Sequence, residues 1–168
     1  MLDVEELERL STVVGGSDSA VLGTTLTSCR AELQVRPGSI VDVLERLRGE
    51  GYNMLMSLHG VDYFPEEPRL GVAYELLSFE HQRRLSVKLR VSLDTPNVPS
   101  VTPTWPTANF HEREVYDMFG VVFDGHPDLR RILMPEDYIG HPQRRDFPIG
   151  GEPVLFTGNE DGNPGWWK

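Results

Sequence analysis

The most regular hydrophobic pattern lies in the middle of the chain. Between residues 85 and 93 every second position is leucine or valine, and the positions between them are serine, lysine or arginine. This period of two is typical of a β-strand with one buried and one solvent-exposed face. Residues 70–79 are also rich in apolar side chains, and only residues 80–84 separate the two segments. We therefore predict two antiparallel strands joined by a tight hairpin.

Three further strands are predicted earlier in the chain. Residues 21–27 are rich in β-branched side chains, and residues 31–36 alternate between apolar and polar positions. Residues 53–59 form the third apolar segment. Between the second and third strands, apolar residues recur at the helical spacing of three and four over residues 39–49. This order predicts a strand, a helix and a strand in succession.

The helix over residues 39–49 begins at Ser39, and we expect its hydroxyl to cap the helix with Asp42 as the return partner. A shorter amphipathic helix is predicted at residues 4–10. Together these elements predict an α+β fold, with a small, mostly antiparallel sheet and helices on one face of it.

Proline changes the character of the chain midway along its length. Ten of the 13 prolines lie at or after Pro96, and proline interrupts both long helices and sheet ladders. One helix is still predicted in this half, because Pro106 suits a first helical position and Gly120 suits a helix end. We predict an α+β domain over residues 1–120, followed by an extended arm and C-terminal tail over residues 121–168.

Composition and charge exclude several classes of function. Leucine, isoleucine, valine and phenylalanine make up 47 of the 168 residues, which is enough for one folded domain. The net charge of -10 argues against binding nucleic acid through a basic face. The single cysteine, Cys29, cannot supply the thiolates of an iron–sulfur cluster. No apolar stretch approaches the ~18 residues of a membrane span, and the acidic start of the chain is unlike a signal peptide. We therefore expect a cytoplasmic chain with no membrane span.

The predicted helix from Pro106 to Gly120 places one carboxylate on its apolar side. Glu112 falls on the hydrophobic stripe, where an ionised carboxylate must be paired, protonated or turned toward a partner. Arg113 and Asp117 are four residues apart on the more polar side, and we predict that they form an ion pair.

Three histidines, His111, His126 and His141, follow one another at intervals of fifteen residues. With Glu114 or Asp137 nearby they are candidates for a metal site or for acid–base catalysis. A spacing of fifteen does not define a coordination geometry in irregular backbone, and histidine before proline is common in turns. A metal-dependent hydrolase that uses His126 and His141 stays open as an alternative function.

The predicted arm, which begins with a short strand at residues 121–123, is rich in arginine pairs. The chain has 14 arginines and two lysines, and the pairs Arg130-Arg131 and Arg144-Arg145 each follow a Gly-His-Pro sequence. Arginine binds carboxylates in a bidentate manner and is favoured at protein interfaces. The segment also carries six large apolar side chains, which favours a partner interface over a solvated, salt-bridged loop: Ile132, Leu133, Met134, Tyr138, Ile139 and Phe147.

These motifs resemble the family of the thirty-kilodalton subunit of respiratory complex I, which includes the C subunit of bacterial NADH-quinone oxidoreductase. The similarity covers about forty residues, from Asn109 to Pro148, and residues 39–93 agree only in their pattern. The motifs are Glu112-Arg113-Glu114, Asp117-Met118-Phe119, the run Gly125 to Asp137, Gly140-His141-Pro142 and Arg144 to Pro148.

The resemblance implies a cofactor-free subunit of the hydrophilic arm of a proton-translocating NADH-quinone oxidoreductase, on the cytoplasmic side of the membrane. It implies docking on the larger D subunit, of the forty-nine-kilodalton type, near the quinone-reducing end. FMN and iron–sulfur clusters belong to partner subunits, and quinone is the substrate of the complex. The alternative is the equivalent subunit of a membrane-bound hydrogenase or of a quinone reductase with another electron donor. The residues expected at the partner interface are Glu112, Arg113, Glu114, Asp117, His126, Arg130, Arg131, His141, Arg144 and Arg145.

Overall fold

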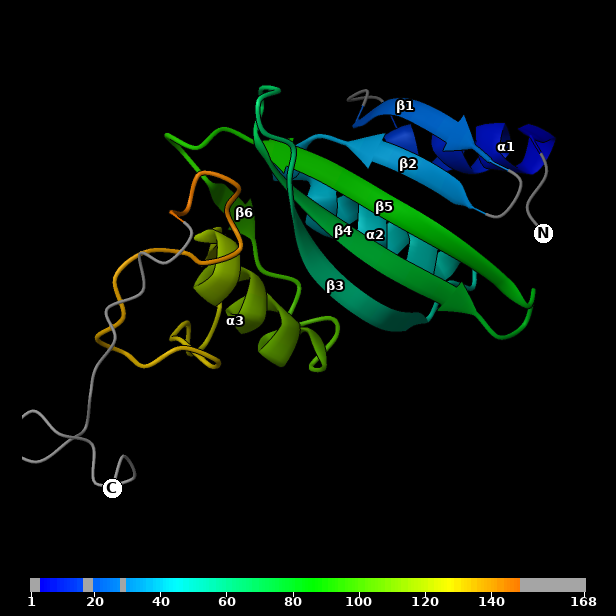
Figure 1. Cartoon of the computed structure of the whole chain (residues 1–168). Helices are drawn as coiled ribbons and strands as arrows, with labels where there is room; N and C mark the ends of the chain where they lie inside the picture. Colours follow the sequence, from blue (N-terminus) through cyan, green and yellow to red (C-terminus); the bar gives the residue numbers. More distant parts are fainter. Residues whose placement is uncertain (1–3, 17–19, 28–29, 149–168) are drawn as a thin grey trace, which may run out of the picture.

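A computed structural model of the chain describes residues 4–16, 20–27 and 30–148 (Figure 1). The α+β fold is confirmed. The helices are α1 (Val4–Gly15), α2 (Ile40–Gly49), preceded by the 3-10 turn η2 (Pro37–Ser39), and α3 (Ala108–Phe119). The strands are β1 (Val21–Leu26), β2 (Ala31–Val35), β3 (Met54–Asp62), β4 (Leu70–Ser78), β5 (Arg83–Val91), β6 (Asn97–Pro99) and β7 (Val122–Asp124).

Five strands form one sheet in the order β1-β2-β5-β4-β3. All neighbouring pairs are antiparallel except β2 and β5, which run parallel, so the sheet is mostly antiparallel as predicted. The predicted hairpin is the β4–β5 pair, whose register brings Ser78 opposite Arg83. The hairpin is confirmed because its pairing depends only on local alternation and a short turn.

The helices cover one face of this sheet and leave the other face open. Figure 1 shows α2 crossing behind β4 and β5, with the opposite face toward the viewer. On the covered side the odd-numbered residues of β5, from Leu85 to Val91, are buried in the core. The C-terminal end of α3 packs against β3, where Phe119 lies directly against Gly60. A side chain larger than hydrogen at Gly60 would overlap the phenylalanine ring.

A second, two-stranded sheet joins segments on either side of α3. β6 pairs in parallel with β7, and Val98 lies opposite Phe123. The predicted strand at residues 121–123 is therefore present with its bounds shifted by one residue. No strand was predicted at β6, because a three-residue strand ending at Pro99 has too little alternation to be recognised.

Several helix ends differ from the predictions. α1 continues five residues past the predicted Leu10, because Val14 extends its buried stripe. Ser39 makes no side-chain hydrogen bond at the start of α2, so the expected capping box is absent and η2 leads into the helix instead. α3 begins at Ala108, two residues after Pro106. Its predicted end is confirmed by Gly120, which has the left-handed φ of 76°. The division of the chain at residue 120 stays a prediction.

Candidate partner interface

The first buried carboxylate of α3 belongs to Glu112, which is fully inaccessible to solvent. It accepts hydrogen bonds from the Ser100 hydroxyl at 2.6 Å, the Val101 backbone N–H at 2.8 Å and the Thr102 hydroxyl at 3.2 Å. Burial raises the pKa of Glu112 above its usual range, and these three hydrogen bonds partly oppose the increase. Glu112 therefore fixes the loop after β6 to α3, and in this conformation its carboxylate points into the chain.

The second buried carboxylate, Asp117, lies further along α3. One oxygen accepts the Nη1–H of Arg131 at 2.6 Å. The other oxygen accepts three consecutive backbone N–H groups, from Ile132, Leu133 and Met134, at 3.1, 2.8 and 2.8 Å. Asp117 thus determines the path of residues 131–134 by charge-assisted hydrogen bonds.

The predicted ion pair between Arg113 and Asp117 is wrong. The sequence pattern placed Asp117 on the polar side of the helix, but the following segment folds back over it and buries it completely. Arg113 instead donates to the backbone carbonyls of Arg130 and Arg131 at 3.1 and 3.0 Å. Burial acts to raise the pKa of Asp117, but the hydrogen bonds from Met134 and Arg131 outweigh it, and the pKa is lowered.

The C-terminal carbonyls of α3 are satisfied by the same irregular segment. Arg131 and the Nδ1–H of His141 both donate to the carbonyl of Asp117, at 3.2 and 3.0 Å. The backbone N–H of Gln143 donates to the carbonyl of Met118, and Nε–H of Arg144 donates to the carbonyl of Phe119 at 2.6 Å. Arginine side chains are favourable at this negative end of the helix dipole. The segment is therefore held at the end of α3 by the last carbonyls of the helix, which have no hydrogen-bond donor within the helix itself.

A buried arginine, Arg69, attaches the C-terminal end of the irregular segment after α3, at Asp146, to the main sheet. Arg69, which is 5% exposed, donates to both oxygens of Asp62 at 2.9 and 2.7 Å and to both oxygens of Asp146 at 2.8 and 2.6 Å. The backbone N–H of Arg145 also donates to Asp62 at 2.8 Å, and its side chain donates to the carbonyl of Phe64. Hydrogen bonds from Arg69 lower the pKa of Asp62 and of Asp146.

Other predicted interface residues have weaker roles or face outward. Nε2 of His126 lies 3.2 Å from the carbonyl of Asn109, and its Nδ1 accepts the backbone N–H of Asp128 at 3.0 Å. Arg130 forms an exposed ion pair with Asp128 at 2.9 Å. Glu114 is exposed on α3. Within the described residues no group of three or more histidine, cysteine, aspartate or glutamate side chains could hold a metal ion.

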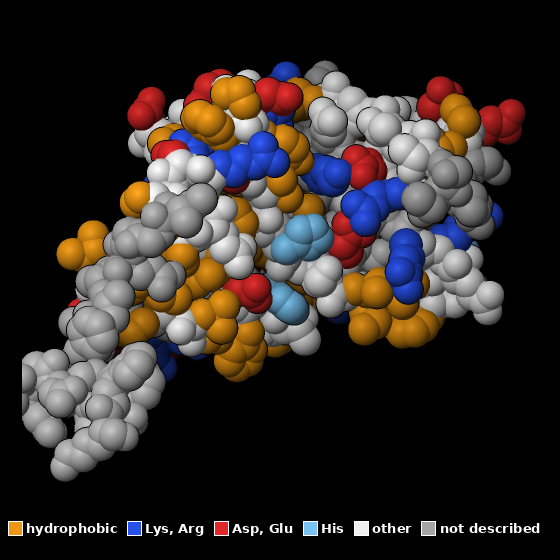
Figure 2. All heavy atoms as spheres, in the orientation of Figure 1, with side chains coloured by type: hydrophobic (Ala, Val, Ile, Leu, Met, Phe, Trp, Pro, Cys, Tyr) orange, Lys and Arg blue, Asp and Glu red, His pale blue; other side chains and the backbone are white. Residues whose placement is uncertain are grey.

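Three large apolar side chains project from the segment held on α3. Leu133 is 60% exposed and Ile139 is 87% exposed, while Ile132 is less exposed. Figure 2 shows hydrophobic side chains gathered on this side of the molecule, beside α3 and the irregular segment. We call the segment 125–148 the arm. The arm is not simply extended, because α3 binds the side chains of Arg131 and Arg144 and the backbone N–H groups of residues 132–134, while Leu133 and Ile139 stay exposed at the surface.

Sequence reasoning missed the residues that anchor the arm from elsewhere in the fold. Ser100 and Thr102 contact Glu112 from the loop after β6, and Arg69 holds Asp146 from 77 positions away. Asp146 itself was visible in the family motif, but nothing in the spacing indicated that its partner was Arg69. No local signal in the sequence could have found these partners.

The fold and the arm define a class: a small α+β protein whose C-terminal irregular segment is built onto the end of one helix. The chain belongs to the family described as "Respiratory-chain NADH dehydrogenase, 30 Kd subunit", which it matches over residues 33–153. It is thus a complex I subunit of this type from an NADH-quinone oxidoreductase, and the family resemblance drawn from the motifs is confirmed.

Relatives agree with this assignment. The chain is 52% identical over 145 residues to the C subunit of NADH-quinone oxidoreductase from Roseiflexus castenholzii, covering 84% of this chain and 83% of the relative. It is 48% identical over 158 residues to the C subunit from Roseiflexus sp., covering 92% and 89%.

Two solved structures share its fold. The trypsin-resistant fragment (1-134) of Nqo5 aligns with a TM-score of 0.63 at 30% identity, covering 75% of this chain and 96% of that one. The membrane-bound sulfane sulfur reductase, an archaeal respiratory membrane complex, contains a chain that aligns with a TM-score of 0.71 at 26% identity, covering 86% and 85%. Within the described residues, no helix is long and apolar enough to cross a membrane.

Proposed function

We propose that this chain is a non-catalytic, cofactor-free subunit whose arm docks on the forty-nine-kilodalton-type subunit of the complex, near the quinone-reducing end. The observation that carries the proposal is the presence of exposed apolar side chains on a segment whose backbone is already fixed. Leu133 and Ile139 project from an arm that Asp117 and Arg69 hold in place. A fixed segment loses little conformational entropy on binding, so its apolar contacts contribute more fully to affinity.

The arginines divide into two groups in this proposal. Arg131 and Arg144 are engaged by α3 and give the arm its shape, whereas Arg130 is exposed and is available to a partner carboxylate. Glu114 lies exposed on α3 and is a second polar contact at the rim. The remaining predicted residues act on the interface indirectly, by positioning the arm and the loops beside it: Glu112, Arg113, Asp117, His126, His141 and Arg145.

The same proposal assigns the redox chemistry to other subunits. FMN and the iron–sulfur clusters belong to partners, quinone is the substrate of the whole complex, and this chain lies at the cytoplasmic side of the membrane. Support comes from the single cysteine of the sequence, since clusters are usually held by four thiolates. The names of the curated relatives support NADH as the electron donor.

Co-purification of the assembled complex tests the docking surface. We would replace Leu133 and Ile139 together by aspartate and measure recovery of the forty-nine-kilodalton-type subunit with the tagged chain. Burying one such side chain is worth about 1.5–3 kcal/mol, so we expect a loss of roughly tenfold or more. Val13→Asp on α1 is the matched control, because Val13 is also an exposed apolar residue. Equal recovery of the partner with the double variant and the control would refute the docking surface.

A second candidate function is that of the equivalent subunit in a related respiratory complex that uses another electron donor. The chain of the sulfane sulfur reductase complex has the same fold, so this architecture serves in more than one kind of respiratory complex. Its identity of 26% is well below the 52% shared with the C subunit of an NADH-quinone oxidoreductase. Oxidation of NADH by membranes, lost when this chain is deleted and restored on complementation, would distinguish the first candidate from the second.

A further inference from the structure

Three basic side chains meet where the arm is attached to the C-terminal end of α3: Arg131, His141 and Arg144. The Nδ1–H of His141 and Nη1 of Arg131 both donate to the backbone carbonyl of Asp117, at 3.0 and 3.2 Å. Nε–H of Arg144 donates to the next carbonyl but one, that of Phe119, at 2.6 Å. The imidazole ring therefore lies beside two guanidinium groups.

Gly120 allows the imidazole and one guanidinium to approach each other closely. Nε2 of His141 and Nη2 of Arg144 both occupy the space that a Cβ of Gly120 would take, so the two nitrogens are neighbours. A guanidinium nitrogen can only donate hydrogen bonds. A lone pair on Nε2 is compatible with this neighbour, whereas an Nε2–H would set donor against donor and positive charge against positive charge. The geometry favours the neutral ring with its proton on Nδ1.

The surroundings of the ring also favour its neutral form. Burial is the largest influence and lowers the pKa of His141 below its usual value of 6.5. The charges of Arg144 and Arg131 lower this pKa further, while the backbone carbonyl and the carboxylate of Asp117 act in the opposite direction. Because the attached arm disfavours the proton, a proton on the ring disfavours the attached arm by the same free energy. The charges that face Arg144 in turn are those of Asp62, Arg69 and Asp146.

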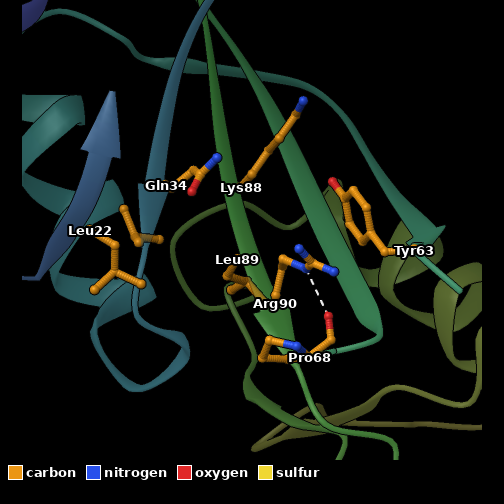
Figure 3. Close-up of a pocket in the computed structure, with 8 residues that line it drawn as sticks. Leu22, Gln34, Tyr63, Pro68, Lys88, Leu89 and Arg90 are labelled. Carbon is orange, nitrogen blue, oxygen red and sulfur yellow. Dashed lines mark hydrogen bonds between the residues drawn. The ribbon is translucent and has the colours of Figure 1, made fainter. Parts of the chain in front are cut away.

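On the open face of the main sheet, two basic side chains have carboxylate partners of their own. Lys88 and Arg90 line a cavity of about 190 Å³ there (Figure 3). Lys88 is paired with Glu32 at 2.7 Å, and Nη1 of Arg90 lies 3.3 Å from a carboxylate oxygen of Glu66. The ring of His141 instead bonds to a backbone carbonyl that it shares with a guanidinium. A proton added to that ring therefore gains much less from its neighbours.

We propose that His141 is a pH-dependent switch: the neutral ring holds the arm on the end of α3, and protonation at Nε2 releases residues 140–145 from the helix. Release of these residues weakens the docking of the arm on its partner subunit. This consequence rests on the docking function proposed above, whereas the switch itself is a property of this chain alone.

Amide hydrogen exchange of the isolated full chain, corrected for the intrinsic effect of pH on exchange, tests the switch. The reporter is the backbone N–H of Gln143, which donates to the carbonyl of Met118. We expect its protection factor to fall about threefold or more between about pH 7.5 and about pH 5.5, because the attachment weakens as the pH falls below 6.5. The N–H of Leu133 should stay protected over this range, since its acceptor Asp117 has a pKa below 3.8 and remains ionised.

Two asparagine variants separate His141 from the other histidine of the arm. His141→Asn retains a side-chain N–H for the carbonyl of Asp117 but takes up no proton, so protection at Gln143 should no longer depend on pH. His126→Asn is the matched control, because His126 also stands in a Gly-His-Pro sequence, and its pH dependence should equal that of the wild type.

Nitrogen NMR of the wild-type imidazoles keeps the test decisive if His141→Asn does not fold. The midpoint of the exchange transition at Gln143 should coincide with the titration midpoint of His141. Protection at Gln143 that is independent of pH, that varies equally in His141→Asn and the wild type, or that follows the titration of another histidine would overturn the switch.

Co-purification at the same two pH values tests the effect on docking. Recovery of the forty-nine-kilodalton-type subunit with the tagged wild-type chain should fall about threefold or more at the lower pH, and recovery with His141→Asn should fall less. Equal losses with the two chains would refute the effect on docking, even where the exchange data support the switch. Failure of the docking surface itself would appear differently, as equal recovery with the Leu133 and Ile139 double variant and its control.

Discussion

The arm depends most directly on one side chain, so Asp117→Asn is the most informative perturbation. The substitution preserves the shape of the side chain but removes the negative charge of the carboxylate, which accepts hydrogen bonds from Arg131 and from three backbone N–H groups. Removing one partner of a buried ion pair costs about 3–5 kcal/mol. Because Arg131 is 14% exposed and also donates to two carbonyls, we expect the lower end, about 3 kcal/mol. For a chain of this length that corresponds to a decrease in Tm of roughly 6–12 °C.

Urea unfolding and amide hydrogen exchange of the isolated chain would measure this effect. We expect the free energy of unfolding to fall and the amides of Ile132, Leu133 and Met134 to lose protection, because their acceptor is weakened. Glu114→Gln, on an exposed position of the same helix, should change stability by less than about 0.5 kcal/mol. If Asp117→Asn matches Glu114→Gln in both measurements, Asp117 does not hold the arm.

The pH dependence provides an independent check on Asp117. Its pKa is lower in the folded chain than the usual value of 3.8. The ionised group therefore stabilises the folded state above about pH 4, and this contribution is lost as the pH falls through the folded-state pKa. The acid limb of the stability curve should be shallower in Asp117→Asn than in the wild type. An identical acid limb in the two proteins would contradict the lowered pKa.

Three more variants examine the rest of the framework. Arg69→Met leaves Asp62 buried without its cation, so we expect a loss of about 3–5 kcal/mol in urea unfolding, and an unchanged midpoint would contradict the Arg69 anchor. Glu112→Gln removes a carboxyl whose folded-state pKa lies above 4.5. The contribution of Glu112 to the stability of the wild type decreases as the pH rises above 4.5, so the variant should gain stability relative to the wild type over that range; a pH-independent difference would argue against a raised pKa. Gly60→Ala forces a methyl group against Phe119, and we expect a loss of about 1–3 kcal/mol by thermal unfolding, whereas no loss would mean that α3 shifts freely.

Local patterns predicted much of the fold. The strict alternation in β5, the short turn before it and the helical spacing in α2 all depend on residues close to one another in the chain, and each element was found. Gly120 ends α3 as predicted because a left-handed residue at a helix end is favourable mainly for glycine. The cap predicted at Ser39 is absent because the 3-10 turn η2 leads into α2 there, and the Ser39 side chain makes no cap hydrogen bond.

The candidate interface was predicted in part. The sequence identified the residues of the arm, and the unusual position of Glu112 on an apolar stripe correctly indicated that its carboxylate needs partners. It did not reveal that Asp117 would also be buried, because burial there is created by residues 131–134 folding back. A surface position on an isolated helix becomes an internal one when a later segment crosses it.

Family membership, the α+β class and an arm rich in arginine and apolar side chains can all be read from the amino-acid sequence alone. Motif order and hydrophobic period are properties of neighbouring residues, so they need no coordinates. Which arginines face inward depends instead on the folded chain, since hydrogen bonds such as that from Arg69 to Asp146 join positions 77 residues apart. The cavity lined by Gln34, Lys88 and Arg90 on the open face of the main sheet likewise depends on the folded chain, since these residues come from different strands. Charged side chains bind whichever unpaired acceptors the folded backbone brings near them, and distance along the chain does not specify those acceptors.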